Sequence, residues 1–319
     1  MKDVVLALDL GGTKLASALF DLRGKILRKE IVPLAKRSGA QVGELIRQQI
    51  KKSFSVAKGK KITIRATGVS VPGISHEKTG KVWAPNIPGW ENYPLRAEIR
   101  AQLADKSIPV KIESDRACYI LGETWQGAAK NCRNAIFLAV GTGIGAGILV
   151  DGKILRGAND IGGAIGWLAL QKPYRAEYKS CGCFEHHASG EGLVKIAKEF
   201  LASDKAYRGV LKRKKEFNTA DVFAALASGD PIAKKVLEQA IEFWGMAAAN
   251  LVSLFNPEKI IFGGGVFGPA KKLLPRIFTE AKKWAQPVSI RQVKFVPSQL
   301  GGDTGLYGAG YSVLRNVGE

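Results

Sequence analysis

The apolar positions along this chain predict strands and helices in alternation. Strand-sized apolar runs stand at 4–8, 62–71, 135–140 and 259–262, and a further strand is expected at 109–114. The pattern also predicts helices at 40–57, 94–104, 116–129 and 231–255, another that begins near Ser189, and a last one from about Thr304. Helices that alternate with strands predict an α/β protein with mixed sheets.

The helix expected at 231–255 shows most clearly which side is buried. Its apolar residues recur three and four positions apart, at Val236, Leu237, Ala240, Ile241 and Trp244. That spacing places them on one side of a helix, so we expect this stripe to pack into the core. Asn256-Pro257 follows directly and ends the helix, because proline cannot continue it.

Two segments of the chain share one pattern, 4–27 and 135–155. Each reads as an apolar strand, a turn rich in glycine and threonine, a second strand, a tight turn around aspartate and Gly-Lys, and then Ile-Leu. A repeat of this kind predicts two lobes built on the same plan.

The glycine turns in these two segments differ from the commoner nucleotide motifs. In a Rossmann or P-loop motif the glycines open a helix that holds the phosphate. Here both turns lead into a second strand, LASALF after the first and GAGILV after the second. Glycine lets backbone N–H groups approach phosphate oxygens closely. One such hairpin is more often an ordinary turn, whereas two matched copies favour phosphate binding.

Length and composition indicate a globular protein of about two domains. The chain has 319 residues, 46% of them hydrophobic. Its longest apolar runs are far shorter than the ~20 residues of a membrane helix. Met1 is followed almost at once by an apolar strand, without a signal-peptide pattern. We therefore expect a cytoplasmic protein without a membrane partner. Its cysteines are expected to be thiols or metal ligands and not a disulfide framework: Cys118, Cys132, Cys181 and Cys183.

The net charge of +20 is concentrated in basic clusters at 51–61, 211–215 and 282–283. Such clusters can mark binding of nucleic acid, a membrane surface or polyphosphate. Apart from Phe54, these clusters hold no aromatic residue, so aromatic residues do not alternate with the lysines as they would on a base-stacking surface. The charge therefore favours a solvated surface, and we expect no nucleic-acid partner.

Six motifs occur in one order along the chain: DLGGTK (9–14), WAPNIPGW (83–90), ESD (113–115), GTGIGAG (141–147), CGCFE (181–185) and IIFGGGV (260–266). Together they resemble the ROK family, the bacterial repressors and sugar kinases of the actin-like, ribonuclease-H-like ATPase superfamily. Family repressors carry a DNA-binding domain ahead of the first strand. Three residues stand there in this chain, so a glucokinase-like kinase is expected.

The resemblance also implies how the chain divides into lobes. The N-terminal lobe would comprise 1–118 plus 304–319, and the C-terminal lobe 119–303. The two hairpins would face each other across a cleft and bind the phosphates of ATP.

The ATP-binding residues follow from the same resemblance. Asp9 would orient Mg²⁺ through water, with a polar strand end as the alternative. The phosphate contacts would come from Gly11, Gly12 and Thr13 on one side and from Gly141, Thr142 and Gly143 on the other. Lys14 would add positive charge, although a solvated lysine is an equal alternative. Gly263, Gly264 and Gly265 would let adenosine lie against the backbone.

Asp115 matches the family's catalytic base. Taken alone, an aspartate just before a helix is more often an N-cap. Within the ordered motifs we interpret it as the base. Asn86 and Glu185 would hydrogen-bond sugar hydroxyls; the alternative for Asn86 is a turn residue after proline.

The chain departs from the family pattern near the acceptor. Ser114 stands where an asparagine is usual and would be a substrate contact. Ala164 and Trp167 stand where the family has glutamate and histidine. Trp167 would either line the substrate site or pack in the core beside Ile165 and Leu168. Specificity for glucose is therefore in doubt.

The family's zinc loop is shortened here to Cys181-Gly182-Cys183, and its histidine is absent. Cys181, Cys183 and His187 are only weak zinc candidates. We expect a protein that folds and works without zinc.

These inferences lead to one functional hypothesis. The chain would be an ATP- and Mg²⁺-dependent kinase, a homodimer by family habit, for a hydroxyl of a sugar, sugar derivative or cyclic polyol. The alternatives are a non-catalytic sensor of sugar or nucleotide, and a polyphosphate-dependent kinase suggested by the basic clusters.

Overall fold

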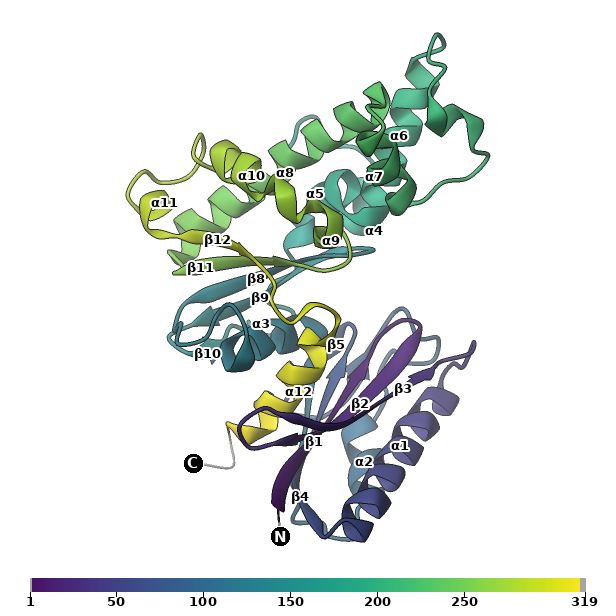
Figure 1. The fold of residues 1–319 in the computed structure, drawn as a ribbon, viewed down its shortest axis with the longest axis vertical. Coiled ribbons are helices and arrows are strands. Elements are labelled where there is room, and N and C mark those ends of the chain that lie inside the picture. The colour runs from purple at the N-terminus through teal and green to yellow at the C-terminus, as the bar shows by residue number, and fades with distance from the viewer. Residues whose placement is uncertain (1, 316–319) are drawn as a thin grey trace. The chain divides into compact units, whose positions relative to one another are not determined.

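The computed structural model describes residues 2–315, which form two compact units (Figure 1). The first unit contains the chain up to Asn131, Ile154–Gly162, and the chain from Gln299 onward; the second contains Cys132–Lys153 and Gly163–Ser298. These boundaries differ from the expected 118/119 and 303/304. The first lies later because helix α3 (Asp115–Gln126) packs within the first unit.

A five-stranded sheet forms the centre of the first unit. Its order is β3-β2-β1-β4-β7, where the strands are β1 (Lys2–Leu10), β2 (Lys14–Asp21), β3 (Ile26–Pro33), β4 (Ile62–Val71) and β7 (Val110–Ser114). β1 pairs antiparallel with β2 and parallel with β4, and β4 pairs parallel with β7. Strand β7, whose end carries the ESD motif, therefore runs in the same direction as β1.

Successive residues of β1 face two different cores. Val4, Leu6 and Leu8 pack in a cluster with residues of α1 (Ala40–Gly59) and α2 (Leu95–Gln102), whereas Val5 and Ala7 pack with α3 and α12 (Thr304–Leu314). Because successive side chains of a strand point to opposite faces, one sheet buries apolar side chains on both sides.

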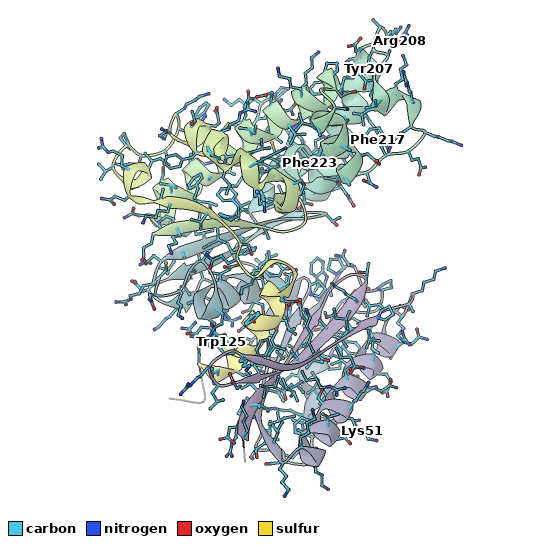
Figure 2. The ribbon with its side chains drawn as sticks, in the orientation of Figure 1. Lys51, Trp125, Tyr207, Arg208, Phe217 and Phe223 are labelled. Atoms are coloured by element: carbon cyan, nitrogen blue, oxygen red, sulfur yellow. The ribbon has the colours of Figure 1, made fainter. Side chains whose placement is uncertain are left out.

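Helices α3 and α12 pack unusually closely on one another. A Cβ at Gly308 would lie 1.8 Å from the Cys118 carbonyl oxygen, and one at Gly122 would lie 2.4 Å from the Thr304 carbonyl oxygen. Trp125, labelled in Figure 2, stacks on Tyr311 with ring centroids 5.5 Å apart. These two glycines therefore allow the close contact that sets the position of α3 relative to α12.

The second unit repeats the sheet of the first. Its order is β10-β9-β8-β11-β12, where the strands are β8 (Ala135–Val140), β9 (Ile144–Val150), β10 (Lys153–Ile154), β11 (Lys259–Gly263) and β12 (Lys294–Pro297). β8 and β9 pair antiparallel, as β1 and β2 do. The predicted repeat is confirmed, strand for strand.

The remaining elements of the second unit are mostly helical. They are α4 (Tyr178–Cys181), α5 (Cys183–Ala188), α6 (Gly190–Ser203), α7 (Thr219–Ala227), α8 (Pro231–Phe255), α9 (Phe267–Ala270), α10 (Leu274–Ala281), α11 (Ser289–Gln292), and the 3₁₀ turns η1 (Ile165–Trp167), η2 (Val210–Arg213) and η3 (Lys271–Leu273). The first unit adds β5 (Ile74–Ser75), β6 (Val82–Trp83) and η4 (Gly301–Asp303). Within residues 2–315, no helix combines the length and the apolar character that crossing a membrane requires.

Helix α8 confirms the prediction from the apolar stripe. It spans Pro231–Phe255, and the five stripe residues are all buried. Asp230 caps its start by accepting from the N–H groups of Ile232 and Ala233, each at 3.0 Å. Asn256 ends it in the left-handed conformation, with φ of 41°. Helix α5, in contrast, was not predicted: it comes just before the helix that we expected to begin near Ser189.

Candidate active site

The turn between β1 and β2 leaves backbone donors unused. The Gly11 N–H donates to the Lys14 carbonyl at 2.9 Å, which closes the turn. Among the described residues, the N–H groups of Gly12 and Thr13 have no hydrogen-bond partner. A Cβ built on Gly12 meets no atom within 4 Å, so the space beside the turn is open. Lys14 is exposed. The turn can therefore offer two N–H donors to an anion.

The turn between β8 and β9 has the same character. The Gly141 N–H donates to the Gly143 carbonyl at 2.9 Å, and the Gly141 carbonyl accepts from the Gly190 N–H at the start of α6 at 2.8 Å. The N–H groups of Thr142 and Gly143 are without a partner in the part of the chain that the structure describes. Each unit thus carries one hairpin turn with two free donors.

Asp9 lies at the end of β1 beside Ser70 of β4, its partner in the sheet register. The start of α12 approaches it so closely that a Cβ on Gly305 would lie 2.6 Å from both carboxylate oxygens. Burial raises the pKa of Asp9 to about 6, and the negative charge of Asp115 adds to this, whereas Ser70 and Lys14 oppose it. Sequence reasoning missed both Ser70 and Gly305, because each lies far along the chain from Asp9.

Asp9 fits a hydrated magnesium ion. Within residues 2–315, no ion pair joins a lysine or arginine to Asp9 or Asp115; the positive charges of Lys14 and Arg116 act on these carboxylates without outweighing the effect of burial on their pKa values. Mg²⁺ takes oxygen ligands and is commonly held by one or two carboxylates, water and substrate phosphates. The described residues contain no group of three or more His, Cys, Asp or Glu side chains that could hold a metal by themselves.

Asp115 is the first residue of α3, and Ser114 is the N-cap. The Ser114 hydroxyl accepts from the Ala117 N–H at 3.3 Å, so the capping role considered for Asp115 belongs to Ser114. The Asp115 carboxylate accepts only local hydrogen bonds, from the Arg116 N–H at 2.7 Å and from the Tyr119 hydroxyl. Burial raises its pKa, while Arg116 opposes that shift. Asp115 therefore has the character of a proton acceptor.

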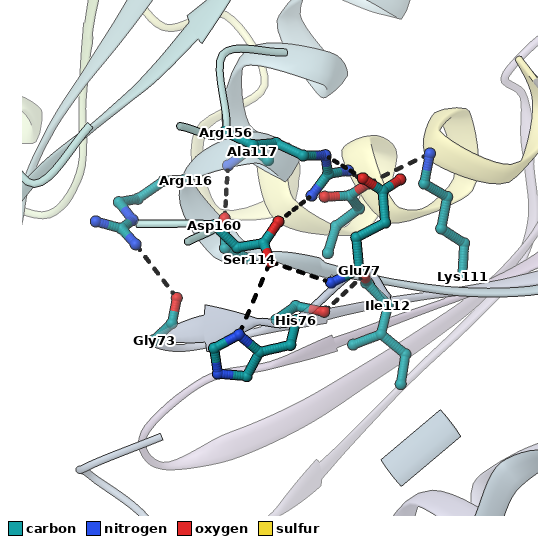
Figure 3. A network of polar contacts seen from close by, with 12 residues as sticks. Gly73, His76, Glu77, Lys111, Ile112, Ser114, Arg116, Ala117, Arg156 and Asp160 are labelled. Carbon is teal, nitrogen blue, oxygen red and sulfur yellow. Dashed lines mark hydrogen bonds and ion pairs between the residues drawn. The ribbon is translucent and has the colours of Figure 1, made fainter. Parts of the chain in front are cut away.

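A buried ion network holds the end of β7 (Figure 3). Glu113 is fully buried and pairs with Arg156 of segment 154–162 and with Lys111 at 3.4 Å. Arg156 also pairs with Glu77 at 3.1 Å, and Asp160 accepts from the Glu77 N–H at 3.3 Å. Sequence reasoning did not assign a role to Glu113, although a charged residue inside a predicted strand, two positions before Asp115, was a usable signal.

The loop 83–90 is held by its second tryptophan. Trp90 is fully buried, stacks on Tyr93 with centroids 4.4 Å apart, and donates its indole N–H to the Gly39 carbonyl at 3.0 Å. Asn86 is exposed on this loop, and its side chain has no partner among the described residues. The turn is closed by backbone groups, from the Ile87 N–H to the Ala84 carbonyl at 2.9 Å. Asn86 is therefore free to contact a ligand.

Glu185 is tied to the second hairpin turn. Its carboxylate accepts from the Ile144 N–H at 2.6 Å, and a Cβ on Gly143 would lie 2.6 Å from the same oxygen. Burial raises the pKa of Glu185, and the Ile144 N–H opposes this. The position of Glu185 is thereby fixed relative to the turn formed by residues 141–143.

His187 is part of the core and does not assemble with the cysteines. Its Nε2 lies 2.7 Å from the Tyr178 hydroxyl, its Nδ1 lies 2.8 Å from Gln239 Nε2, and its ring stacks on Phe243. Both ring nitrogens are thus engaged. Burial lowers the pKa of His187 to about 4. Cys183 is buried and Cys181 is partly exposed. The absence of zinc stays a prediction.

The three successive glycines that begin with the last residue of β11 have different surroundings. A Cβ on Gly263 would lie 2.2 Å from the Phe137 ring, and one on Gly264, whose φ is +88°, would lie 2.3 Å from the Val140 carbonyl. Both are therefore required by the packing against β8. Only at Gly265 would a Cβ meet nothing within 4 Å.

Trp167 does not pack in the core, the alternative we considered for it. Its neighbours Ile165 and Gly166 are buried, whereas Trp167 is 57% exposed. Ala164 is partly exposed beside it.

Two units with one strand order, each carrying a hairpin turn with free amide groups, define an actin-like ATPase fold. The chain belongs to the ROK family, whose model matches residues 5–316. It is 32% identical over 317 residues to a glucokinase of Halalkalibacterium halodurans, which covers 97% of this chain and 94% of that protein.

Solved structures give the same assignment. The ROK hexokinase from Thermus thermophilus is 29% identical, with a TM-score of 0.79 and 99% of each chain covered. A ROK family glucokinase from Streptomyces griseus, solved in complex with glucose and AMPPNP, is 28% identical, with a TM-score of 0.76 and coverage of 98% of this chain and 99% of that one.

Proposed function

We propose that this protein transfers a phosphoryl group from ATP to a hydroxyl group of a sugar or a related polyol. The observation that carries the proposal is the state of Asp115: a carboxylate with a raised pKa, released from capping by Ser114, at the end of a strand beside Asp9. The similarity to glucokinases over nearly the whole chain supports the same reaction class.

In the proposed reaction, Asp115 accepts the proton of the attacking hydroxyl. A carboxylate is a better base when its pKa is raised toward the working pH, as it is here. The free N–H groups of Gly12, Thr13, Thr142 and Gly143 bind phosphate oxygens, and Lys14 adds positive charge. Gly11 and Gly141 shape the two turns by closing them.

Asp9 would hold Mg²⁺ through water. When bound, the ion neutralises charge on the phosphates. The open backbone at Gly265 would contact adenosine, with Gly263 and Gly264 shaping the approach.

Asn86, Ser114 and Glu185 would bind the acceptor. Asn86 has a free side-chain amide, and Glu185 keeps acceptor capacity beyond its bond to Ile144. The Ser114 hydroxyl accepts one hydrogen bond as the cap, so its O–H donor and its second lone pair would be what it offers a ligand. A homodimer and a cytoplasmic location complete the proposal and rest on the family resemblance and the sequence pattern.

The test is Asp115→Asn, which keeps the shape of the side chain and removes the proton acceptor. We expect kcat to fall about 10²–10⁴-fold, with ATP affinity retained because both hairpin turns are unchanged. An ADP-release assay over a panel of sugars and polyols gives the rates, and exposed Asp105→Asn is the matched control.

Near-normal turnover of Asp115→Asn on the best acceptor would contradict the assigned base. If no acceptor increases ADP release by the unaltered protein, it is a sensor or uses another donor. Repeating the panel with polyphosphate in place of ATP separates those two outcomes.

A further inference from the structure

The backbone of Gly166 and Trp167 packs closely against Glu185 on one side and Gly182 on the other. A Cβ on Gly166 would lie 3.0 Å from a Glu185 carboxylate oxygen. A Cβ on Gly182, whose φ is +82°, would lie 2.6 Å from the Trp167 Cα. Because glycine is required at these close approaches, the position of Trp167 relative to Glu185 is set by packing and is not free to drift.

The indole of Trp167 has no partner within the described range 2–315. No hydrogen bond or ring contact involves it, and 57% of the residue is exposed. Trp90 and Trp244 are, in contrast, fully buried, and each donates its indole N–H at 3.0 Å to a backbone carbonyl. A large aromatic group on a backbone held by close packing, yet itself left uncovered, is suited to contact a ligand.

The segment around Trp167 offers almost no polar side chains. From Gly163 to Leu168 the side chains are aliphatic or absent, apart from the indole and its N–H. His186 and His187 follow Glu185 directly, but both are buried, so neither supplies a polar group at the surface. The side chains that this segment contributes near Glu185 are therefore only aliphatic groups and one indole, while the charged groups that act on Glu185, Glu191 and Lys195, belong to α6.

We infer that the acceptor is a sugar ring bearing an apolar substituent, such as an acylamino or alkoxy group, which packs on the indole of Trp167. This inference rests on the proposed function and names its substrate class. An aromatic surface is well matched to methyl and ring C–H groups. It cannot accept hydrogen bonds from hydroxyl groups, and hydroxyls left unpaired in a closed site lose binding energy.

We therefore expect the enzyme to prefer a sugar that carries an apolar substituent over glucose. Glucose presents hydroxyls at every position where a substituted sugar presents an apolar group. With one more hydroxyl unpaired than in a singly substituted sugar, we expect kcat/KM for glucose to be about 10-fold or more below that of the best substituted sugar. N-acetylglucosamine and methyl glucoside, compared with glucose, are the probes.

Substitutions of Trp167 distinguish a residue that contacts the acceptor from one that only supports the fold. Trp167→Ala should lower kcat/KM for the best substituted sugar at least about 10-fold and leave glucose within about 3-fold, and Trp167→Phe should restore part of the loss. Ala164→Glu combined with Trp167→His should raise activity on glucose. Trp284→Ala is the matched control, because Trp284 is 61% exposed in the same unit but far along the chain from Glu185.

The inference is overturned if glucose is the best acceptor, or if Trp167→Ala lowers all acceptors equally. Both outcomes leave the proposed kinase activity standing. Absence of phosphoryl transfer to every acceptor by the unaltered protein would instead overturn the proposed function itself.

Discussion

Asp9 carries its negative charge at an energetic cost in the metal-free protein. Its pKa of about 6 in the folded protein exceeds the ordinary value of 3.8. A carboxyl group whose pKa is raised by folding stabilises the fold only while it is protonated. That contribution is present at low pH and is lost as the pH rises through about 6. At 1.36 kcal/mol per pKa unit, the loss is on the order of 1–3 kcal/mol.

Replacing Asp9 by asparagine should therefore stabilise the metal-free protein and abolish its activity. We expect a gain on the order of 1–3 kcal/mol in the free energy of unfolding at pH 7.5, which disappears near pH 4. Urea unfolding in EDTA at both pH values measures it. An Asp9→Asn protein that is less stable than the unaltered protein at pH 7.5 would contradict this account of the site.

At the scale of single residues, sequence motifs located the candidate site but not its surroundings. DLGGTK and ESD pointed to Asp9 and Asp115 because these motifs are short and local, and their order along the chain resembles the ROK family. The approach of Gly305 to Asp9 depends on tertiary packing between the two ends of the chain. No local pattern predicts a contact of that kind. The roles assigned to these residues stay predictions.

At the scale of elements, α5 depends on contacts made by its side chains. It has six residues, too few to be a stable helix in isolation. His187 fastens it through Tyr178, Gln239 and Phe243. Since Glu185 lies on the same helix, the His187 contacts also hold a proposed acceptor residue in place.

His187 should make the stability of the protein sensitive to acid. Its pKa is about 4 in the folded protein against 6.5 ordinarily, so the unfolded chain takes up the proton first. The stabilising contribution is complete above pH 6.5 and is lost as the pH falls toward 4, by about 3 kcal/mol at most. His187→Phe should reduce this pH dependence in urea unfolding, whereas Tyr178→Phe should retain it.

The chelator EDTA serves as a further control in that experiment. Because both nitrogens of His187 are engaged by side chains, EDTA should leave the unfolding curve of the unaltered protein unchanged. Unfolding on chelation, with stoichiometric zinc in the purified protein, would contradict the expectation of a zinc-free fold.

The contrast between α8 and α5 shows which elements a sequence can predict. The 25 residues of α8 carry a repeated apolar stripe, an N-cap and a terminating Asn-Pro. The short α5 follows a glycine at φ of +82° and has no room for a repeat. Its helical state comes from tertiary contacts, which local patterns do not contain.

At the scale of the whole molecule, Arg156 fastens a segment of chain within the first unit. Segment 154–162 interrupts the second unit in sequence, and its Arg156, labelled in Figure 3, pairs with the fully buried Glu113 of the first unit. Removing one member of a buried ion pair is costly, because the other charge is left uncompensated. Lys111, at 3.4 Å, can compensate only in part.

Arg156→Met should destabilise the protein by about 3–5 kcal/mol and lower kcat. Adding Glu113→Gln should recover much of the stability, because the buried charge is then removed. Urea unfolding and the ADP-release assay follow both effects. Unchanged stability in Arg156→Met would show that the pair does not hold the segment.

The repeat of the whole fold was predictable because its two copies share a local pattern. The boundaries of the units were not predictable from the sequence, because they depend on the residues at which the chain passes from one unit to the other. The composition of residues 154–162 gives no sign that this segment belongs to the first unit.

The position of α12 determines the order in which a newly synthesised chain can fold. Val5, Ala7 and Phe20 pack against Leu306, Ala309 and Val313, so the first strands of the sheet are covered by a helix that follows far along the chain. On the ribosome, one face of that sheet stays uncovered until residues 304–314 have been synthesised. The second unit, which ends at Ser298, has its full sequence earlier. The strands that are synthesised first are therefore the last to complete their packing.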